Sequence, residues 1–334
     1  MVHRIKIVLT VATVSLLAIL ALGETIAFAD DDGIDAVMSP ILEDYALDES
    51  NFAMGYYNTL TGESWYYNGD ASMIGGSIYK LPLNMLYEEK LNAGELSLAD
   101  SVAGTSLEAA MEASLVNSNN DISEKMRNEL GGFETFRVLS AKYFGLDPNA
   151  LTEAYRTENI YSARGAIQML SYLNEHSEEY PVVLGLMRQA QPDTFFREKV
   201  TDYPVVHKYG AFEGALNDVG IIYTDGPFLL AVFTFHSSAN VLGDIAAAMT
   251  DYTVSENAKY RQEQEIQTPQ GGTGAAAPTA VPAAAVTDLP ASPEPTKEPV
   301  NKTSVNRWQY VLDTIPLIFV TAYLVIHEKA KGRK

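Results

Sequence analysis

Two runs rich in aromatic residues open the folded part of the chain. The runs at 52–58 and 64–68 combine Tyr, Trp and Phe and predict two β-strands, and Thr61-Gly62-Glu63 between them predicts a hairpin turn. Beyond residue 77 the apolar positions recur at helical spacing until about residue 190. The clearest helical segments are at 81–91, 107–115, 134–144 and 163–173.

Strand-like patterns return in the second half of this region. Predicted strands at 204–210, 217–223 and 228–235 are followed by a helical pattern at 241–252. Because strands lie on both sides of the helical block in the sequence, we expect one sheet assembled from both ends of the folded region. Helices would pack on this sheet, and the block between would form an inserted helical subdomain. The expected class is α/β, as an α+β sandwich.

The N-terminus has the pattern of a secretory signal. His3, Arg4 and Lys6 precede an apolar run at 7–22, and Ala27-Phe28-Ala29 fits an A-x-A cleavage site. We therefore predict a signal peptide at 1–29. The alternative is an uncleaved membrane anchor, although the run is shorter than the roughly 20 residues that a span needs.

The C-terminal region has the pattern of a tethered membrane anchor. A Pro/Ala/Thr-rich stretch at 263–307 predicts an extended linker after a domain at 30–262. The apolar segment that follows predicts a transmembrane helix at 308–327, and the Lys/Arg-rich end predicts a basic cytoplasmic tail at 328–334. These features place the domain on the outer face of a cell membrane, with the lipid bilayer as a partner. The alternative for the apolar segment is an amphipathic or core helix.

Composition limits the chemistry that is available. The chain of 334 residues has no Cys, which excludes disulfides, Cys-ligated zinc, iron–sulfur clusters and thiol catalysis. Its 43 Asp and Glu against 23 Lys and Arg give a net charge of −20, which argues against nucleic acid as a partner. No H-E-x-x-H or comparable spacing predicts a metal site, and we expect no cofactor. The chemistry must therefore use hydroxyls, amines or carboxylates.

Ser77-Ile78-Tyr79-Lys80 fits the pattern S-x-x-K. It follows two glycines and opens an apolar helix, where the free N–H groups and the helix dipole stabilise developing negative charge. At a spacing of three residues, Lys80 returns to the face of Ser77 and could take its proton, provided that burial or a second cation lowers the lysine pKa. The alternative is that Ser77 is an N-cap and Lys80 a solvated charge.

Two further polar triplets are candidates for the same site. Ser118-Asn119-Asn120 lies between helical segments, where a hydroxyl could relay a proton and an amide could hold a substrate amide; the alternative is a polar loop. Lys208-Tyr209-Gly210 ends a predicted strand. Its lysine would supply the second cation, and Gly210 would let a substrate lie against the strand; the alternative is an ordinary edge-strand lysine.

Taken in order, the three elements resemble the S-x-x-K, S-D-N and K-T-G signature of the penicillin-recognising serine hydrolases, specifically class A β-lactamases. The resemblance covers roughly residues 34–260. It extends to the hairpin before the serine, to Lys80-Leu81-Pro82-Leu83, and to the segment 217–222. It implies a β-lactamase/transpeptidase-like fold, with a five-stranded antiparallel sheet, flanking helices and an inserted helical subdomain.

The resemblance also implies roles for single residues. Ser77 would be the nucleophile that a β-lactam acylates, and Lys80 would accept its proton, directly or through water. Ser118 would pass the proton toward the leaving nitrogen, and Asn120 would bind the side-chain amide of the substrate.

On the opposite side of the expected site, Lys208 would pair with the substrate carboxylate and help to lower the pKa of Lys80. The oxyanion hole would be the backbone N–H groups of Ser77 and of Ala211, the residue after Gly210.

Three features depart from the family pattern. Asn119 replaces the acidic residue of S-D-N, whose role is mainly structural, and Tyr209 replaces the Ser or Thr of K-[ST]-G that meets the substrate carboxylate. The loop at 145–162 is too short for the full loop that carries the deacylating glutamate in the family. Glu153 and Glu158 are the candidates for that glutamate, and the alternative is that both are surface carboxylates.

The predicted function is a membrane-anchored extracellular β-lactamase that is acylated at Ser77, with slow turnover unless Glu153 or Glu158 activates water. One alternative is a D-Ala-D-Ala carboxypeptidase-like, penicillin-binding enzyme of cell-wall metabolism, and another is a non-catalytic wall-binding domain. A Ser-His-Asp hydrolase is disfavoured because there is no G-x-S-x-G motif. The folded region also has only three histidines, namely His176, His207 and His236.

Overall fold

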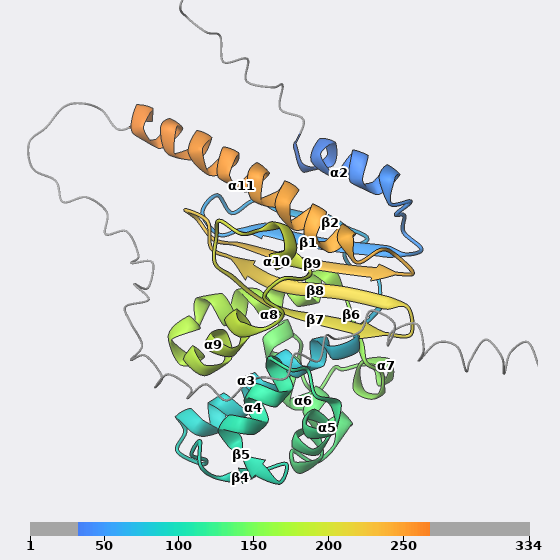
Figure 1. Ribbon diagram of the computed structural model, residues 1–334, viewed down its shortest axis with the longest axis vertical. Helices are drawn as coiled ribbons and strands as arrows, with labels where there is room; N and C mark the ends of the chain where they lie inside the picture. The colour runs from blue at the N-terminus through green and yellow to red at the C-terminus, as the bar shows by residue number, and fades with distance from the viewer. Residues whose placement is uncertain (1–32, 268–334) are drawn as a thin grey trace, which may run out of the picture. The chain divides into compact units, whose positions relative to one another are not determined.

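A five-stranded sheet forms the centre of the computed structural model, which describes residues 33–267 (Figure 1). The strand order is β2-β1-β9-β8-β7, and all neighbouring strands are antiparallel. The strands are β1 (Phe52–Asn58), β2 (Ser64–Tyr67), β7 (Val205–Phe212), β8 (Ala215–Ile222) and β9 (Phe228–Phe235). Because β1 pairs with β9, strands from both halves of the chain close one sheet, and β7 remains at its edge.

Helices cover both faces of the sheet. The helices α2 (Gly33–Asp44) and α11 (Asn240–Gln267) lie over one face, and α8 (Ala163–Glu175) packs on the other (Figure 1). The short helix α10 (Phe196–Lys199) contacts α11. Two further elements on the side of α8, η1 (Gly76–Tyr79) and α9 (Pro181–Gln189), contact β7 directly. The other helical elements are α3 (Lys80–Asn92), α4 (Leu107–Leu115), α5 (Asn120–Glu129), α6 (Phe133–Ser140), η2 (Ala141–Phe144), α7 (Glu153–Thr157) and η3 (Ser177–Glu179).

The sheet separates two hydrophobic clusters, one on each face. Successive side chains of a strand point to opposite faces, so a strand that is buried on both sides contributes to both clusters. Strand β9 does this with Leu229, Ala231 and Phe233 on the side of α8 and with Phe228, Leu230 and Val232 on the side of α11. This double burial explains why 228–235 reads as an uninterrupted apolar run.

The predicted five-stranded antiparallel sheet is confirmed, with strand ends within two residues of the predicted ones. The helix predicted at 134–144 is α6 followed by the 3₁₀ turn η2, and the final helix continues to Gln267, past the predicted domain boundary at 262. Sequence reasoning missed α2 and α10, and it did not place α5, α7 and α9 individually within the block that it predicted to be helical. It also missed two small two-stranded sheets, formed by β3 (Met73–Ile74) with β6 (Ile160–Tyr161) and by β4 (Ser101–Val102) with β5 (Thr105–Ser106).

Several predicted segments lie outside the described residues. They are the signal peptide at 1–29, the transmembrane helix at 308–327, the basic tail at 328–334 and all but the start of the linker at 263–307. Within 33–267, no helix is both long enough and apolar enough to cross a bilayer.

Candidate active site

Ser77 lies in η1, the 3₁₀ turn between β3 and α3. Its side chain is half-buried, and its hydroxyl makes no hydrogen bond within the described residues. The capping residues are Gly75 for η1 and Tyr79 for α3, so the alternative that Ser77 is an N-cap is wrong. The Ser77 hydroxyl therefore lies near the start of a buried helix but does not cap it.

Two glycines bring η1 against the edge strand β7. Gly76 has a φ of +54°, and a Cβ atom on it would stand 2.7 Å from the backbone nitrogen of Ala211. A Cβ atom on Gly210 would overlap the carbonyl oxygen of Gly75. Only glycine permits this approach. It places the backbone beside Ser77 next to that of Ala211, where the oxyanion hole is predicted.

Lys80, the first residue of α3, is fully buried. Its Nζ donates to the carbonyl oxygen of Ser118 (2.6 Å), to Ser118 Oγ (3.1 Å) and to Asn120 Oδ1 (2.7 Å). The alternative that Lys80 is a solvated charge is therefore wrong. In the described chain no hydrogen bond joins Lys80 to Ser77, so the Lys80 amine is held by Ser118 and by Asn120, the first residue of α5.

Ser118 lies in the connection between α4 and α5 with a φ of +52°. This left-handed conformation is costly for a residue other than glycine and is found where surrounding contacts enforce it. Next to it, Asn119 caps α5 by accepting a hydrogen bond from the backbone N–H of Ile122 (2.9 Å). Asn and Asp are both good N-caps, so the capping task survives the replacement of the acidic residue.

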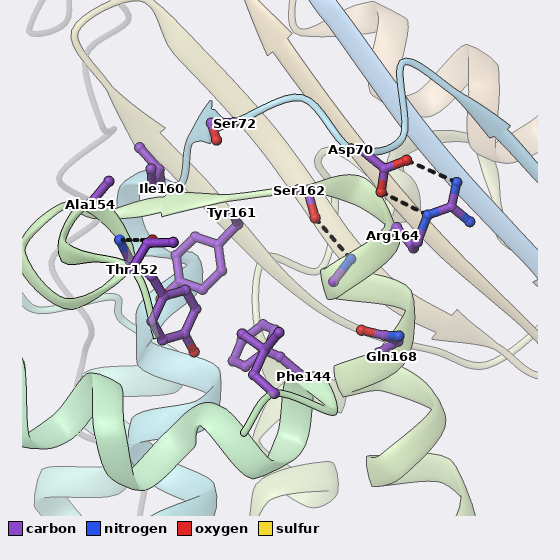
Figure 2. A pocket seen from close by; sticks show the side chains of 13 residues that line it. Asp70, Ser72, Phe144, Thr152, Ala154, Ile160, Tyr161, Ser162, Arg164 and Gln168 are labelled. Atoms are coloured by element: carbon purple, nitrogen blue, oxygen red, sulfur yellow. Dashed lines mark hydrogen bonds and ion pairs between the residues drawn. The ribbon is translucent and has the colours of Figure 1, made fainter. Parts of the chain in front are cut away.

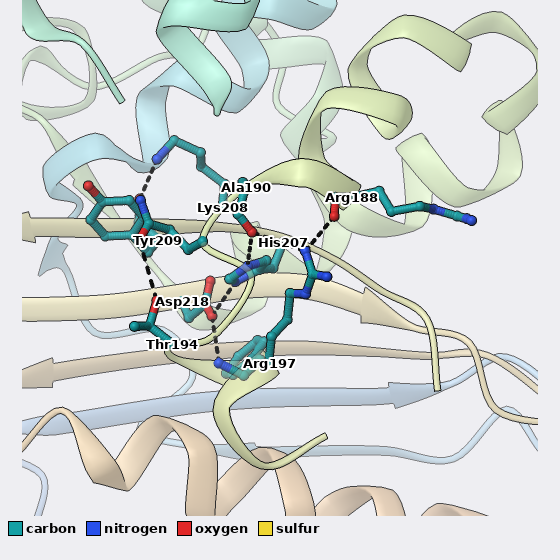
Figure 3. Close-up of polar contacts among 10 residues, drawn as sticks. Arg188, Ala190, Thr194, Arg197, His207, Lys208, Tyr209 and Asp218 are labelled. Atoms are coloured by element: carbon teal, nitrogen blue, oxygen red, sulfur yellow. Dashed lines mark hydrogen bonds and ion pairs between the residues drawn. The ribbon is translucent and has the colours of Figure 1, made fainter. Parts of the chain in front are cut away.

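Lys208 is fully buried although it belongs to the edge strand β7. Its Nζ donates to Ser118 Oγ (3.1 Å). It also donates to the carbonyl oxygen of Tyr209 (2.9 Å) (Figure 3). The alternative that it is an ordinary edge-strand lysine is wrong. The structure thus brings two amines from distant parts of the chain to one serine hydroxyl.

The environment lowers the pKa of both amines. Burial lowers the pKa of Lys80 to about 8, against an opposing effect of Glu124. The pKa of Lys208 lies well below its ordinary value, first because of burial and second because of the charge of Lys80. Two amines that share one hydroxyl in a buried site disfavour double protonation, so a neutral amine is accessible near neutral pH.

Tyr209 covers the Lys208 amine from one side. The Tyr209 ring centroid lies 4.1 Å from Lys208 Nζ, and the ring stacks on Phe195 at a centroid distance of 4.7 Å and an interplanar angle of 16°. An aromatic residue, Tyr209, therefore lies where the resemblance implied a compact hydroxyl.

The deacylation candidates lie on the surface. Glu153, which begins α7, and Glu158, which follows it, are both exposed, and neither bonds to Ser77. From the same loop, Asn159 reaches η1: its Nδ2 donates to the carbonyl oxygen of Gly76 (2.8 Å). Its Oδ1 is buried and has no hydrogen-bond partner among the described residues. Sequence reasoning missed Asn159, because nothing local distinguishes it from other polar loop residues.

A buried His–Asp pair joins β7 and its neighbour β8. His207 Nδ1 lies 2.7 Å from Asp218 Oδ2, and His207 Nε2 lies 3.0 Å from the carbonyl oxygen of Ala190 (Figure 3). Asp218 Oδ2 also accepts from the backbone N–H of Phe196 (3.1 Å). No serine hydroxyl is among the partners that the described residues give this pair, so it assembles no Ser-His-Asp triad.

A cavity of about 370 Å³ opens between the start of α8 and the loop before it (Figure 2). Tyr161, Phe144 and Gln168 line it, and Arg164 pairs with Asp70 at its side. Ser77, Lys80 and Ser118 are not among its lining residues. In the part of the chain that the structure describes, no three His, Asp or Glu side chains gather as a metal site requires.

Most of the described chain matches a known protein family. Residues 37–253 match the β-lactamase enzyme family. A search of the curated proteins found no match.

Solved structures match the same region. A variant of the reconstructed class A β-lactamase of the last common ancestor of Gram-negative bacteria is 17% identical, with a TM-score of 0.57 over 66% of this chain and 99% of its own. A β-lactamase from Xanthomonas campestris is 16% identical, with a TM-score of 0.56 over 66% and 97%. A protein named PBP-A is 13% identical, with a TM-score of 0.56 over 66% and 96%. At these identities the likeness shows the fold alone, and the expected β-lactamase/transpeptidase-like fold is confirmed.

Proposed function

Because the chain belongs to the β-lactamase enzyme family, we propose that it is a serine hydrolase that β-lactams acylate at Ser77. The convergence of Lys80 and Lys208 on the hydroxyl of Ser118 carries this proposal. Two buried amines on one hydroxyl cost stability, and such arrangements concentrate at sites that move protons.

The residues divide the acylation step between them. Ser77 Oγ attacks the lactam carbonyl carbon, and its proton passes to the neutral amine of Lys80 through a bridging water. When the C–N bond breaks, Ser118 hands a proton to the leaving nitrogen and is reprotonated by an amine that is hydrogen-bonded to it. Backbone N–H groups of Ser77 and Ala211 stabilise the oxyanion, each by about 3 kcal/mol.

Hydrolysis of the acyl-enzyme is the slow step in this proposal. Within 33–267, no carboxylate makes a hydrogen bond to Ser77, Lys80 or Ser118. The exposed positions of Glu153 and Glu158 keep both carboxylates in solvent. Without a positioned base for water, the acyl-enzyme should persist.

The same observation favours a second function. A D-Ala-D-Ala carboxypeptidase of cell-wall metabolism uses the same acylation step and needs no rapid hydrolysis of a β-lactam. Release of D-alanine from a cell-wall pentapeptide would support this function. Absence of release, together with a penicillin adduct, would leave the β-lactamase assignment.

Mass spectrometry of the intact protein tests the acylation. Incubation with benzylpenicillin should add the mass of one penicillin, and Ser77→Ala, with an unchanged circular dichroism spectrum, should add none. If neither benzylpenicillin nor a neutral β-lactam ester forms an adduct or is hydrolysed, the proposal is wrong and a non-catalytic wall-binding domain remains.

We also propose that the domain is exported and held at the outer face of a cell membrane by the segment 308–327. The sequence supports this through the signal pattern at 1–29 and the basic residues after the apolar segment. In cells that express the full chain, the protein should sediment with membranes, and a chain that ends at residue 307 should be released into the medium. Equal release of both chains would contradict the anchor.

A further inference from the structure

The buried pair of His207 and Asp218 has no part in the acylation steps proposed above. Both side chains have 0% exposure. His207 Nδ1 lies 2.7 Å from Asp218 Oδ2, and His207 Nε2 lies 3.0 Å from the carbonyl oxygen of Ala190 (Figure 3). Gly220, opposite His207 on β8, leaves room for the imidazole, because a Cβ atom there would stand 2.8 Å from His207 Cβ. The pair is therefore built into the contact of β7 with β8, directly before Lys208 in the sequence.

The hydrogen-bond partners of His207 determine how many protons the pair holds. A carbonyl oxygen can only accept, so Nε2 carries a proton toward Ala190. The contact of Nδ1 with Asp218 Oδ2 requires a second proton, because two lone pairs at this distance repel each other. Wherever that proton lies between the two atoms, the imidazole and the carboxyl group together carry no net charge.

A buried carboxylate at this position needs the imidazole as its countercharge. Asp218 Oδ1 is buried and has no hydrogen-bond partner among the described residues. Its Oδ2 accepts from the backbone N–H of Phe196 (3.1 Å), and an N–H group alone does not neutralise a carboxylate. Within residues 33–267, the ion-pair partner of Asp218 is His207.

The other charged side chains on the elements around β7 are directed elsewhere. Arg197 of α10 donates to the carbonyl oxygen of Ala190 (3.2 Å), which also faces His207 Nε2. The sequence of η1 contains no charged residue, and that of β8 contains only Asp218. The remaining charged residues of α9, α10 and the loop between them are exposed, namely Arg188, Asp193, Glu198 and Lys199.

The charge of the pair acts on the adjacent amine. His207 and Lys208 are successive residues of β7, so their side chains point to opposite faces of the sheet. Burial and the charge of Lys80 lower the pKa of Lys208, whereas the charge of Asp218 raises it. Burial likewise lowers the pKa of Lys80, and Glu124 of α5 opposes this, but Glu124 is exposed and its charge is screened by solvent. A positive imidazole next to Asp218 offsets the buried charge among these.

We propose that His207 is a positioning residue for acylation: by cancelling the charge of Asp218, it lets one of the two amines at Ser118 stay neutral. This inference rests on the proposed acylation of Ser77 and extends its machinery to the opposite face of the sheet. No bond of the reaction is made or broken at His207. It acts through Lys208, because an uncancelled carboxylate would keep the two amines protonated to higher pH.

Two substitutions with different charge balances test this inference. His207→Gln keeps a neutral hydrogen-bond donor but leaves the carboxylate of Asp218 without its cation, so the pair becomes negative. Asp218→Asn removes the carboxylate, and a buried imidazole without a countercharge is then neutral. Its Nδ1 can accept from the new amide while Nε2 still donates to Ala190, so this matched control keeps the hydrogen bonds and a pair without net charge.

The readout is the pH dependence of Ser77 acylation. The second-order rate constant with benzylpenicillin is measured by intact-protein mass spectrometry from about pH 6 to about pH 10. In His207→Gln, the pH at which the rate constant reaches half its maximum should rise by about one unit, which lowers the rate constant at pH 7 about ten-fold. In Asp218→Asn this midpoint should stay where it is in the natural protein. A purely structural role of the pair would slow both variants without moving the midpoint.

The outcomes separate this inference from the proposed function. A midpoint that does not rise in His207→Gln, or one that moves in Asp218→Asn, overturns the inference and leaves Ser77 as the nucleophile. Thermal unfolding checks the fold of both variants. If His207→Gln does not fold, Asp218→Asn decides alone, because a pair that is negative in the natural protein would give it a lower midpoint. Absence of an adduct with the natural protein overturns the proposed function and the inference with it.

Discussion

Lys80 and Lys208 donate to the same oxygen atom, Ser118 Oγ, at 3.1 Å each. Both side chains are fully buried, so each charge makes the other less favourable. A base is therefore available in the site without any carboxylate.

The rate of acylation should rise with pH. Lys80 can accept a proton only when it is neutral, and burial lowers its pKa to about 8. The reactive fraction therefore grows as the pH rises through about 8. We expect the second-order rate constant of Ser77 acylation by benzylpenicillin, measured by intact-protein mass spectrometry, to increase about ten-fold between pH 7 and pH 9. A profile that is flat or falls over this range would contradict a role for the Lys80 amine as base.

Two substitutions of Ser118 separate its hydroxyl from its backbone. Ser118→Ala and Ser118→Gly both remove the shared acceptor, and each should slow acylation by roughly 10²-fold to 10³-fold. The φ of +52° makes alanine costlier than glycine at this position, so Ser118→Gly should be the more stable variant by about 1 kcal/mol. Equal stability of the two variants would argue against strain, and unimpaired acylation would remove Ser118 from the mechanism.

The close approach of η1 to β7 should tolerate no side chain at residue 76. In Gly76→Ala, the new Cβ atom meets the backbone nitrogen of Ala211, and the φ of +54° adds strain. Gly94→Ala is the matched control, because Gly94 has a φ of +71° and nothing within 4 Å of the added atom. The control should lose about 1–2 kcal/mol of stability and still form the Ser77 adduct, whereas Gly76→Ala should form none. Normal acylation of Gly76→Ala would show that this contact is not required.

The acyl-enzyme should be hydrolysed slowly after free penicillin has been removed. After excess benzylpenicillin is removed, the fraction of acylated protein should fall at the same rate in the natural protein, in Glu153→Gln and in Glu158→Gln, because both carboxylates are exposed. Intact-protein mass spectrometry over several hours measures this fraction. A rate lowered ten-fold or more in either variant would identify that glutamate as the base for water.

The pattern of apolar residues was sufficient to predict the strands of the sheet. The strands at 52–58 and 228–235 lie where they were predicted. A strand that is buried on one face has alternating apolar residues, and a strand that is buried on both faces has a continuous apolar run, so both can be found in the local sequence. Helices such as α5, with its mostly polar sequence, leave a weaker record and were missed. Ser77, Lys80, Ser118 and Lys208 were candidates because their motifs occur in a fixed order.

Tertiary structure decided how these side chains are used. The sequence placed Lys80 three residues after Ser77, yet its amine is held by Ser118 and Asn120, and the hydroxyl of Ser77 has no described partner. The amide of Asn159 bonds to Gly76, 83 residues earlier in the chain. Phe195 stacks on Tyr209, which belongs to a different element. Local spacing records which face of an element is apolar, because that depends on the turn or pleat alone. The hydrogen-bond partners of a side chain depend on how the elements pack against one another, and no single segment of the chain contains that information.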